Sequence, residues 1–315
     1  MASSCLPYKR PWIGSVPVLG GKRKSIKQKP IFTQNPTYMP IQHRQEPSLI
    51  DQLFISMLLG LIQGLSEWLP ISSTAHLRIA EHFLGFQATP LFNVTLHIGT
   101  LAVVIFYFRH DVKGILTALV HWDFRSEHGR FIPLIVVASI PTGIIGILYD
   151  LYIGDSYQTF LIMGITFLVG ATLLVLSKFS KETQTDITYK RALIMGAAQG
   201  AASFPGLSRS GATISSGLLQ DIKRETVFRF SFLLSIPAII GDLGVEAYHE
   251  RGSFVSQGVG ISTTNLLIAL AFTAVAGYLA IVLVKKLVLT KRFHYFAVYT
   301  FALGIALIIF SLLGI

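Results

Sequence analysis

The sequence is poor in charged residues. Of its 315 residues, only 13% are Asp, Glu, Lys or Arg, and 52% are hydrophobic. A soluble globular domain carries about a quarter charged residues. The chain also has a single cysteine, Cys5, which excludes an intramolecular disulfide and says nothing about the redox compartment. The composition therefore predicts an integral membrane protein.

Acidic residues are missing from the first 45 positions, which carry eight basic residues. These are Lys9, Arg10, Lys22, Arg23, Lys24, Lys27, Lys29 and Arg44. Without these eight, the 26 basic residues of the chain fall to 18, against 16 acidic residues. The net charge of +10 is therefore a property of this leader and not of the apolar body.

We treat residues 1–48 as a basic leader that precedes a membrane domain at 49–315. No apolar h-region follows the basic residues, which excludes a secretory signal. One interpretation is a disordered tail or a start assigned too far upstream, with Met39 or Met57 as the true start. The other is an organellar transit peptide, because the segment is acid-free, basic and contains serine. We expect a multi-pass protein of the cell membrane, or of a plastid membrane in the second case, and no nucleic-acid partner.

Apolar runs of about 20 residues are needed to cross a bilayer. Six runs are predicted to do so: 91–108, 131–150, 159–178, 227–248, 264–284 and 294–315. Two further segments, 50–84 and 190–220, are apolar at both ends but have Pro, Gly and polar residues at their centres. They are predicted to be re-entrant helical hairpins that enter and leave on one face of the membrane.

The order of these segments predicts an internal repeat. Residues 49–180 and residues 188–315 each hold one hairpin and three spans. Because three is odd, the second half starts on the opposite side of the membrane, and the repeat is inverted in topology. Basic loops are expected in the cytoplasm, and three loops are basic: 109–130, 178–191 and 285–292. The predicted fold is thus an all-α polytopic membrane protein with an inverted repeat.

One feature conflicts with this topology, because it places the basic leader outside. The conflict disappears if the leader is removed, if it is not part of the protein, or if the first hairpin is a true span.

A polar motif occurs twice, once in each interrupted segment. The first copy runs from Gln63 to His76 (QGLSEWLPISSTAH), and the second from Gln199 to Thr213 (QGAASFPGLSRSGAT). Both contain Gln-Gly, small residues, an aromatic, a proline and a cluster of hydroxyl residues. Such polar sequence is tolerated at membrane depth where it lines a protein cavity. The two copies predict a site near the midplane, at the interface of the two halves.

The first copy holds residue types suited to binding an anion. Pro70 ends a helix, and a new helix starts among three good N-cap residues, namely Ser72, Ser73 and Thr74. A helix N-terminus binds anions. On this new helix, Ser73 and His76 are three residues apart and therefore share a face. Glu67 is a costly carboxylate in a membrane and therefore a functional candidate. The alternatives are helix capping alone for the hydroxyl residues and a satisfied core histidine for His76.

The second copy repeats this design with a cation. Pro205 and Gly206 break the helix, and Ser208 or Ser210 is expected to cap the new one. Arg209 lies at that helix start, where its guanidinium matches the geometry of a phosphate. The alternative is a structural ion pair between Arg209 and Glu67.

Other polar residues of the apolar runs are less informative. Asn93 and His97 lie four apart on one face of their span, where they either support the site or form an interhelical hydrogen bond. Asp242 and Glu246, also four apart, are expected to be solvated near the outer end of theirs.

These motifs carry a family resemblance. The pattern from Gln63 and Glu67 to His76 resembles the first signature of the undecaprenyl-diphosphate phosphatase family, which is linked to bacitracin resistance. The segment from Pro205 to Thr213 resembles the second signature, and FSFLLSIP at 230–237 resembles the helix that follows it. The resemblance covers about 50–315 and leaves out the leader.

The resemblance implies hydrolysis of undecaprenyl diphosphate to the monophosphate, which recycles a lipid carrier of cell-wall synthesis. It implies a divalent cation, Mg²⁺ or Ca²⁺, and often a homodimer. By position, the implied catalytic residues are Glu67, Ser73, His76 and Arg209. The implied substrate-binding residues are Gln63, Ser72, Thr74, Ser208, Ser210 and Thr213. Gln63 stands where the family often has Glu, which leaves Glu67 as the expected metal ligand.

Two mechanisms and two rival functions follow from this sequence. Either Ser73 is the nucleophile with His76 as acid and base, or Glu67 and His76 activate a water. A lipid phosphatase of the Pro-Ser-Gly-His type is excluded because that motif is absent. A flippase or transporter of polyprenyl phosphate is the other rival, since inverted repeats suit transport.

Overall fold

The computed structural model describes residues 49–154, 159–249 and 262–314. The basic leader therefore lies outside the described residues, as does Asp155, between the predicted spans 131–150 and 159–178. Within the described ranges the chain is α-helical, apart from short 3₁₀ turns and an isolated β-bridge between Gln184 and Ile222.

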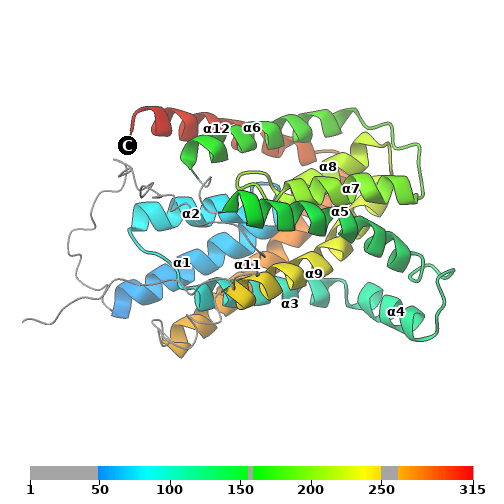
Figure 1. Ribbon diagram of the computed structural model, residues 1–315, viewed down its shortest axis with the longest axis horizontal. Helices are drawn as coiled ribbons and strands as arrows, with labels where there is room; N and C mark the ends of the chain where they lie inside the picture. Colours follow the sequence, from blue (N-terminus) through cyan, green and yellow to red (C-terminus); the bar gives the residue numbers. More distant parts are fainter. Residues whose placement is uncertain (1–48, 155–158, 250–261, 315) are drawn as a thin grey trace, which may run out of the picture. The chain divides into compact units, whose positions relative to one another are not determined.

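The helices follow the order that the sequence predicts (Figure 1). They are α1 (Leu49–Trp68), α2 (Ser73–Leu84), α3 (Pro90–Tyr107), α4 (Arg109–Val120), α5 (Phe131–Tyr152), α6 (Phe160–Leu176), α7 (Tyr189–Ala201), α8 (Arg209–Leu219), α9 (Arg224–His249), α11 (Thr263–Leu289) and α12 (Phe296–Leu312). Six helices among the described residues are long and apolar enough to cross a membrane, and they contain the cores of α3, α5, α6, α9, α11 and α12. The predicted polytopic, all-α class is confirmed.

The prediction of a loop at 109–130 is wrong for the first half of this segment, which forms helix α4. This helix has 12 residues, so a search for membrane-length apolar runs does not find it. Val112 and Ile115 pack against the core, while Leu116 and Leu119 are exposed. Helix α4 is therefore partly anchored to the bundle and presents an apolar edge.

The two interrupted segments break where their prolines predict. Helix α1 ends two residues before Pro70, and α2 starts at Ser73. Helix α7 ends before Pro205, and α8 starts at Arg209. Gly206 has φ +100° in the second break, a backbone conformation that favours glycine. Each polar motif thus forms a helix–turn–helix unit.

Helix α1 packs closely against α11, and α7 packs closely against α5. A Cβ on Gly60 would lie 2.6 Å from the backbone oxygen of Ala269, and a Cβ on Gly196 would lie 2.0 Å from that of Ala138. The first contact is accompanied by a hydrogen bond of 3.1 Å from the Thr273 hydroxyl to the Gly60 carbonyl. The second contact has an equivalent bond of 2.9 Å to the Gly196 carbonyl. The two helix pairs are therefore built alike.

An aromatic cluster lies directly behind the first helix break. Trp68, the last residue of α1, stacks on Phe232 of α9 with ring centroids 5.2 Å apart. Phe108 and Phe228 extend this cluster, and all four residues are at least nine-tenths buried. The cluster fixes the end of α1 against α9, and so positions the residue before Trp68, which is Glu67.

Candidate active site

The two helix breaks contact each other, although they lie more than 130 positions apart in the sequence. The backbone N–H of Gly206 donates to the Ser72 hydroxyl at 3.0 Å. The Ser208 hydroxyl donates to the Leu69 carbonyl at 3.3 Å. The prediction that the two polar motifs meet is confirmed by these bonds.

Glu67 is the centre of the site. Its side chain is buried, and its Oε2 accepts from the Ser73 hydroxyl at 2.6 Å and from Gln63 Nε2 at 3.1 Å. The predicted residues Gln63, Glu67 and Ser73 are therefore brought together. A hydroxyl that donates to a buried carboxylate is the arrangement by which a carboxylate accepts the proton of a serine nucleophile.

Arg209 completes this cluster from the second motif. It is the first residue of α8, and its Nη2 donates to Oε1 of Glu67. Both side chains are largely buried, with 16% and 6% exposure. The ion pair weighed as the alternative reading of Arg209 is therefore present, and it joins the two motifs.

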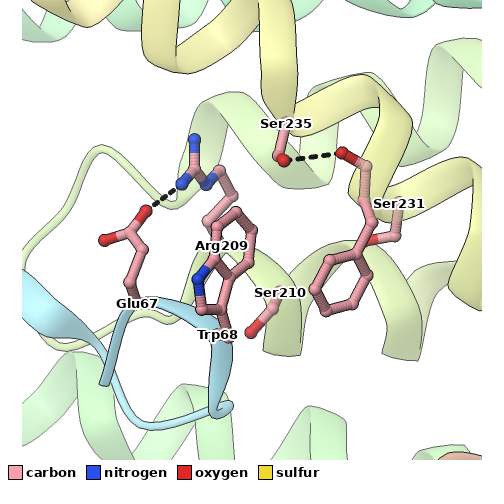
Figure 2. Close-up of a pocket in the computed structure, with 7 residues that line it drawn as sticks. Glu67, Trp68, Arg209, Ser210, Ser231 and Ser235 are labelled. Atoms are coloured by element: carbon pink, nitrogen blue, oxygen red, sulfur yellow. Dashed lines mark hydrogen bonds and ion pairs between the residues drawn. The ribbon is translucent and has the colours of Figure 1, made fainter. Parts of the chain in front are cut away.

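A small cavity lies beside this ion pair (Figure 2). It is lined by Glu67, Trp68, Arg209, Ser210, Ser231, Phe232 and Ser235. Its volume of about 10 Å³ has room for about one water molecule. A phosphate group does not fit into this volume.

The hydroxyl residues at the two helix starts behave differently. Ser208 caps α8 as predicted, because its Oγ accepts from the Gly211 N–H at 3.2 Å. Ser72 occupies the cap position of α2, but it has φ +67° and makes no side-chain capping bond. Its hydroxyl instead accepts from Gly206, so Ser72, one of the three candidate cap residues, holds the cap position without making the capping bond. The first turn of α2 is left without that cap.

The remaining predicted substrate-binding residues lie at different depths. Ser210 lines the cavity and shares a hydrogen bond of 3.1 Å with Ser208. Thr213 is fully buried, and its hydroxyl contacts the Arg209 carbonyl and the Ser231 hydroxyl, so it ties α8 to α9 behind the cavity. Thr74 is exposed, and no hydrogen bond among the described residues joins it to the cluster.

Both ring nitrogens of His76 contact groups other than Glu67 and Ser73. Its Nδ1 lies 2.8 Å from the Ser72 carbonyl, and its Nε2 lies 2.6 Å from the Tyr299 hydroxyl of α12. A carbonyl only accepts, so Nδ1 carries the proton and the neutral ring accepts from Tyr299 at Nε2. The ring also stacks on Tyr299 and meets the edge of Phe167.

Sequence reasoning missed several residues around the cavity. Trp68, Ser231 and Ser235 line it, and the two serines lie four apart on one face of α9. That spacing was a signal, because two hydroxyls on one face of an apolar helix indicate a polar surface. Tyr299 gave no such signal, since one tyrosine among the aromatic residues of α12 is ordinary.

Among the described residues, His97 and Asn93 do not form the interhelical bond that was one alternative. Nδ1 of His97 lies 3.0 Å from the backbone carbonyl of Asn93, within α3. Asp242 is exposed, as expected.

The described residues do not fit a resident metal ion. They contain no group of three or more His, Cys, Asp and Glu side chains placed to hold one. Glu67, the expected ligand, already accepts hydrogen bonds at both oxygens. We therefore derive no step through a metal bound by protein side chains alone.

Fold and site together define a class: a polytopic α-helical membrane protein with a buried carboxylate, serine and arginine joined at two helix breaks. Residues 56–306 match the family model described as bacitracin resistance protein BacA. The chain belongs to this family.

Curated relatives extend over most of the chain. It is 38% identical to an undecaprenyl-diphosphatase of Methanosphaera stadtmanae, over 81% of this chain and 97% of that protein. It is 36% identical to an undecaprenyl-diphosphatase of Desulforapulum autotrophicum, over 82% of this chain and 98% of that protein. It is 37% identical to an undecaprenyl-diphosphatase of Halothermothrix orenii, over 82% of this chain and 98% of that protein.

Proposed function

We propose that this protein is an undecaprenyl-diphosphatase, which hydrolyses a polyprenyl diphosphate to the monophosphate and phosphate within a membrane. The observation that carries the proposal is the Arg209–Glu67–Ser73 cluster, because it supplies an anion anchor, a proton acceptor and a nucleophile at one point. Family membership and the names of the curated relatives support the same activity.

Substrate binding exchanges the partner of Arg209. The terminal phosphate takes the guanidinium from Glu67, because phosphate offers two oxygens and more negative charge to its planar fork. Helices α2 and α8 start at the two breaks, which contact each other, and a helix N-terminus favours an anion. Once Arg209 has moved to the phosphate, Glu67 is a stronger proton acceptor for Ser73.

The chemistry then uses the hydrogen bond already formed between Ser73 and Glu67. The Ser73 oxygen attacks the terminal phosphorus, its proton passes to Glu67, and the anhydride bond breaks to release polyprenyl monophosphate. Arg209 offsets the charge that develops on the phosphoryl oxygens. Water then hydrolyses the phosphoserine. The alternative, in which Glu67 and His76 activate water directly, predicts turnover without a phosphoserine.

The divalent cation enters this proposal with the substrate. Mg²⁺ is commonly held by one or two carboxylates together with substrate phosphates, and a diphosphate supplies oxygens that the protein lacks. Gln63 beside Glu67 offers an amide oxygen in place of a second carboxylate. We therefore expect Mg²⁺ or Ca²⁺ to act as a complex with the diphosphate.

We further propose an inverted repeat with two re-entrant hairpins, α1–α2 and α7–α8. Its support is the matching of helix contacts: α1 packs on α11 as α7 packs on α5, and α3 packs on α11 as α9 packs on α5. Helices α6 and α12 pack on each other, as equivalent elements across a pseudo-twofold axis do. The plasma membrane is the proposed location, with the basic loops in the cytoplasm.

Phosphate release tests the activity. Purified protein in detergent is given undecaprenyl diphosphate, and inorganic phosphate is measured against time for wild type and Ser73→Ala. The proposal expects turnover by wild type and a loss of at least about 100-fold in the variant. A wild-type protein that binds the lipid and releases no phosphate would point to the transporter alternative.

Cysteine labelling tests the topology. In a Cys5→Ser background, one cysteine is placed at position 155 and, separately, one at 181. An impermeant thiol reagent added to intact cells is expected to label the first and not the second. Labelling of both from the same side would contradict the proposed inverted repeat, because α6 would then not cross the membrane.

A further inference from the structure

We propose that a second pocket, formed where two of the basic loops meet, binds the headgroup of a phospholipid of the phosphatidylethanolamine type. In this site Arg130 binds the phosphate of the headgroup and Asp186 binds its ammonium group. The pocket shares no lining residue with the cavity beside Glu67. The inference is therefore independent of the proposed hydrolysis.

The second pocket, which we call the loop pocket, is far larger than the cavity beside Glu67. Its volume is about 440 Å³, within the range of roughly 300–1,000 Å³ that is typical of sites for small organic ligands. Its walls come from the loop before α5, the first residues of α5, the segment 185–189 that leads into α7, and Thr226 near the start of α9. The basic loops at 109–130 and 178–191 therefore both contribute to it.

The loop pocket lies where two helices enter the apolar part of the protein. Helix α5 is long and apolar enough to cross a membrane and starts at Phe131, and α7 starts at Tyr189. Both of these residues line the pocket, and the two helices pack side by side (Figure 1). The polar headgroups of a bilayer flank its hydrocarbon core, at the ends of the spanning helices. The pocket is thus at the depth of phospholipid headgroups.

The lining of the loop pocket carries one cation and one anion. Nη1 of Arg130 lies 3.4 Å from Oδ1 of Asp186, and the two side chains are 51% and 69% exposed. An exposed pair of this kind contributes little to stability. Arg130 has further N–H donors, and each carboxylate oxygen of Asp186 can accept a second hydrogen bond. Phe124 and Tyr189 add aromatic rings to the lining, and such rings attract ammonium groups. A ligand that carries both a phosphate and an ammonium group matches these charges.

Hydrogen bonds hold the segment around Asp186 in place. The Thr226 hydroxyl donates to the Thr185 carbonyl at 3.3 Å, and Nη1 of Arg191 donates to the Asp186 carbonyl at 3.1 Å. The Thr185 hydroxyl donates to Oδ2 of Asp186 at 3.1 Å. The segment is therefore tied to α9 and to α7, and its carboxylate is oriented before a ligand binds.

Exposed apolar residues continue from the pocket along both helices. On α5, Val136 and Ile140 follow the lining residue Pro133 by three and seven positions, and both are more than half exposed. On α7, Leu193 follows Tyr189 by four positions and is also exposed. These spacings keep side chains on one face of a helix. Such surfaces suit acyl chains that extend from the headgroup into the bilayer, so the occupant is a membrane lipid and not a soluble phosphate.

The end of α4 is a further indication of the membrane surface. Val120 and Trp122 are among the most exposed apolar side chains of this region, and the ring of Trp122 meets that of Phe124 with centroids 5.8 Å apart. Phe124 lines the pocket. Tryptophan is enriched at the interface between membrane and water, so α4 places the pocket at the same level as α5 and α7 do.

Binding is measured on the full-length protein in a neutral detergent. Phosphatidylethanolamine, phosphatidylcholine and phosphatidylglycerol with identical acyl chains are titrated separately, and bound lipid is counted by native mass spectrometry. We expect phosphatidylethanolamine to bind at least about 10-fold more tightly than the other two. Phosphatidylglycerol has no ammonium group, and the quaternary ammonium of phosphatidylcholine has no N–H to donate to Asp186.

Two charge variants test the assigned contacts. Arg130→Gln should weaken binding of phosphatidylethanolamine by at least about 10-fold, because a charge-assisted hydrogen bond to the phosphate is lost. Asp186→Asn should remove the preference for phosphatidylethanolamine over phosphatidylglycerol. Arg125→Gln and Glu225→Gln are the matched controls, since each is an exposed neighbour in sequence of a lining residue and does not itself line the pocket. Both should bind lipid as the wild type does.

A steric variant tests the location without removing a charge. Thr185 is exposed and lines the pocket, so Thr185→Trp should fill it and abolish binding of phosphatidylethanolamine there. Thr183 is also exposed but lies outside the lining, and Thr183→Trp should bind as the wild type does. Thermal unfolding without added lipid is the folding control for every variant.

Three outcomes would overturn the inference. Equal binding of the three lipids by the wild type would reject the match to a phosphate and an ammonium group, and this comparison needs no variant. Unchanged affinity in both Arg130→Gln and Thr185→Trp would show that the lipid binds elsewhere. Glycerophosphoethanolamine carries the same headgroup without acyl chains, and if it bound as tightly as the lipid, the pocket would be a site for a soluble ligand.

Discussion

Replacing Arg209 by lysine tests whether the geometry of the guanidinium matters, and not only its charge. In the structure Arg209 pairs with Glu67 and lines the small cavity beside this pair. Lysine keeps the charge but cannot bind two phosphate oxygens with a planar fork. The loss of one charge-assisted hydrogen bond, about 1.5–3 kcal/mol, corresponds to a decrease of about 10- to 150-fold in kcat/KM.

Lysine is the informative substitution because it leaves Glu67 paired. Removing the positive charge altogether would leave a buried carboxylate uncompensated, at a cost of about 3–5 kcal/mol in stability, and lost activity would then report unfolding. Phosphate release is measured across substrate concentration, with thermal unfolding of the same samples as the folding control.

Arg229→Lys is the matched control, since Arg229 pairs with Asp111 and Glu127 and does not line the cavity. It should keep wild-type kcat/KM. Near wild-type turnover in Arg209→Lys would refute the two-pronged contact with phosphate and leave charge alone as the role of Arg209.

Four further predictions follow. Gln63→Glu adds a carboxylate beside the one that serves Ser73, so half-maximal activation should need less Mg²⁺; identical titration curves would show that position 63 does not contact the cation. Tyr299→Phe removes the hydrogen bond to the histidine of the first motif but keeps the stacking, and should lower kcat by about 2- to 10-fold through a loss of about 0.5–1.5 kcal/mol, with KM unchanged. Gly60→Ala forces a Cβ within 2.6 Å of a backbone oxygen and should destabilise by about 1–3 kcal/mol, whereas Gly143→Ala, with nothing within 4 Å, should not. Burial raises the pKa of Glu182, but hydrogen bonds from an arginine and a lysine outweigh burial and hold that pKa below its ordinary 4.5. The ionised Glu182 therefore stabilises the fold above about pH 4.5, and this contribution is lost on acidification. Thermal unfolding of Glu182→Gln should not show that acid-dependent loss of stability.

The features that the sequence predicted are those with a local cause. Span length depends on a run of apolar residues, and a helix break depends on Pro70 or Pro205, so both can be found without knowing the fold. Ser208 was a predicted cap for the same reason, because capping involves residues three positions apart. The pair between Glu67 and Arg209 was the alternative interpretation of Arg209, because buried opposite charges need partners.

The features that were missed depend on distant parts of the chain. Nothing near His76 predicts that Tyr299, 223 positions later, takes its Nε2. Ser72 has the side chain of a helix cap, but contact with Gly206 uses its hydroxyl instead. Asp242, by contrast, was expected to be solvated because it lies near the outer end of its span, and it is exposed.

In the proposed mechanism, the buried Arg209–Glu67 pair also accounts for how the site selects its substrate. Removing two charges from water costs about as much as their mutual attraction returns, so such a pair contributes little net stability. It can therefore be exchanged at low cost for another anion that holds the guanidinium equally well. A neutral lipid headgroup cannot make this exchange, because it would leave both charges of the pair buried without partners. A terminal phosphate can, and by taking Arg209 it releases Glu67 to act on Ser73. Selection and activation are thus the same event, since the serine gains its proton acceptor when a doubly charged group has entered.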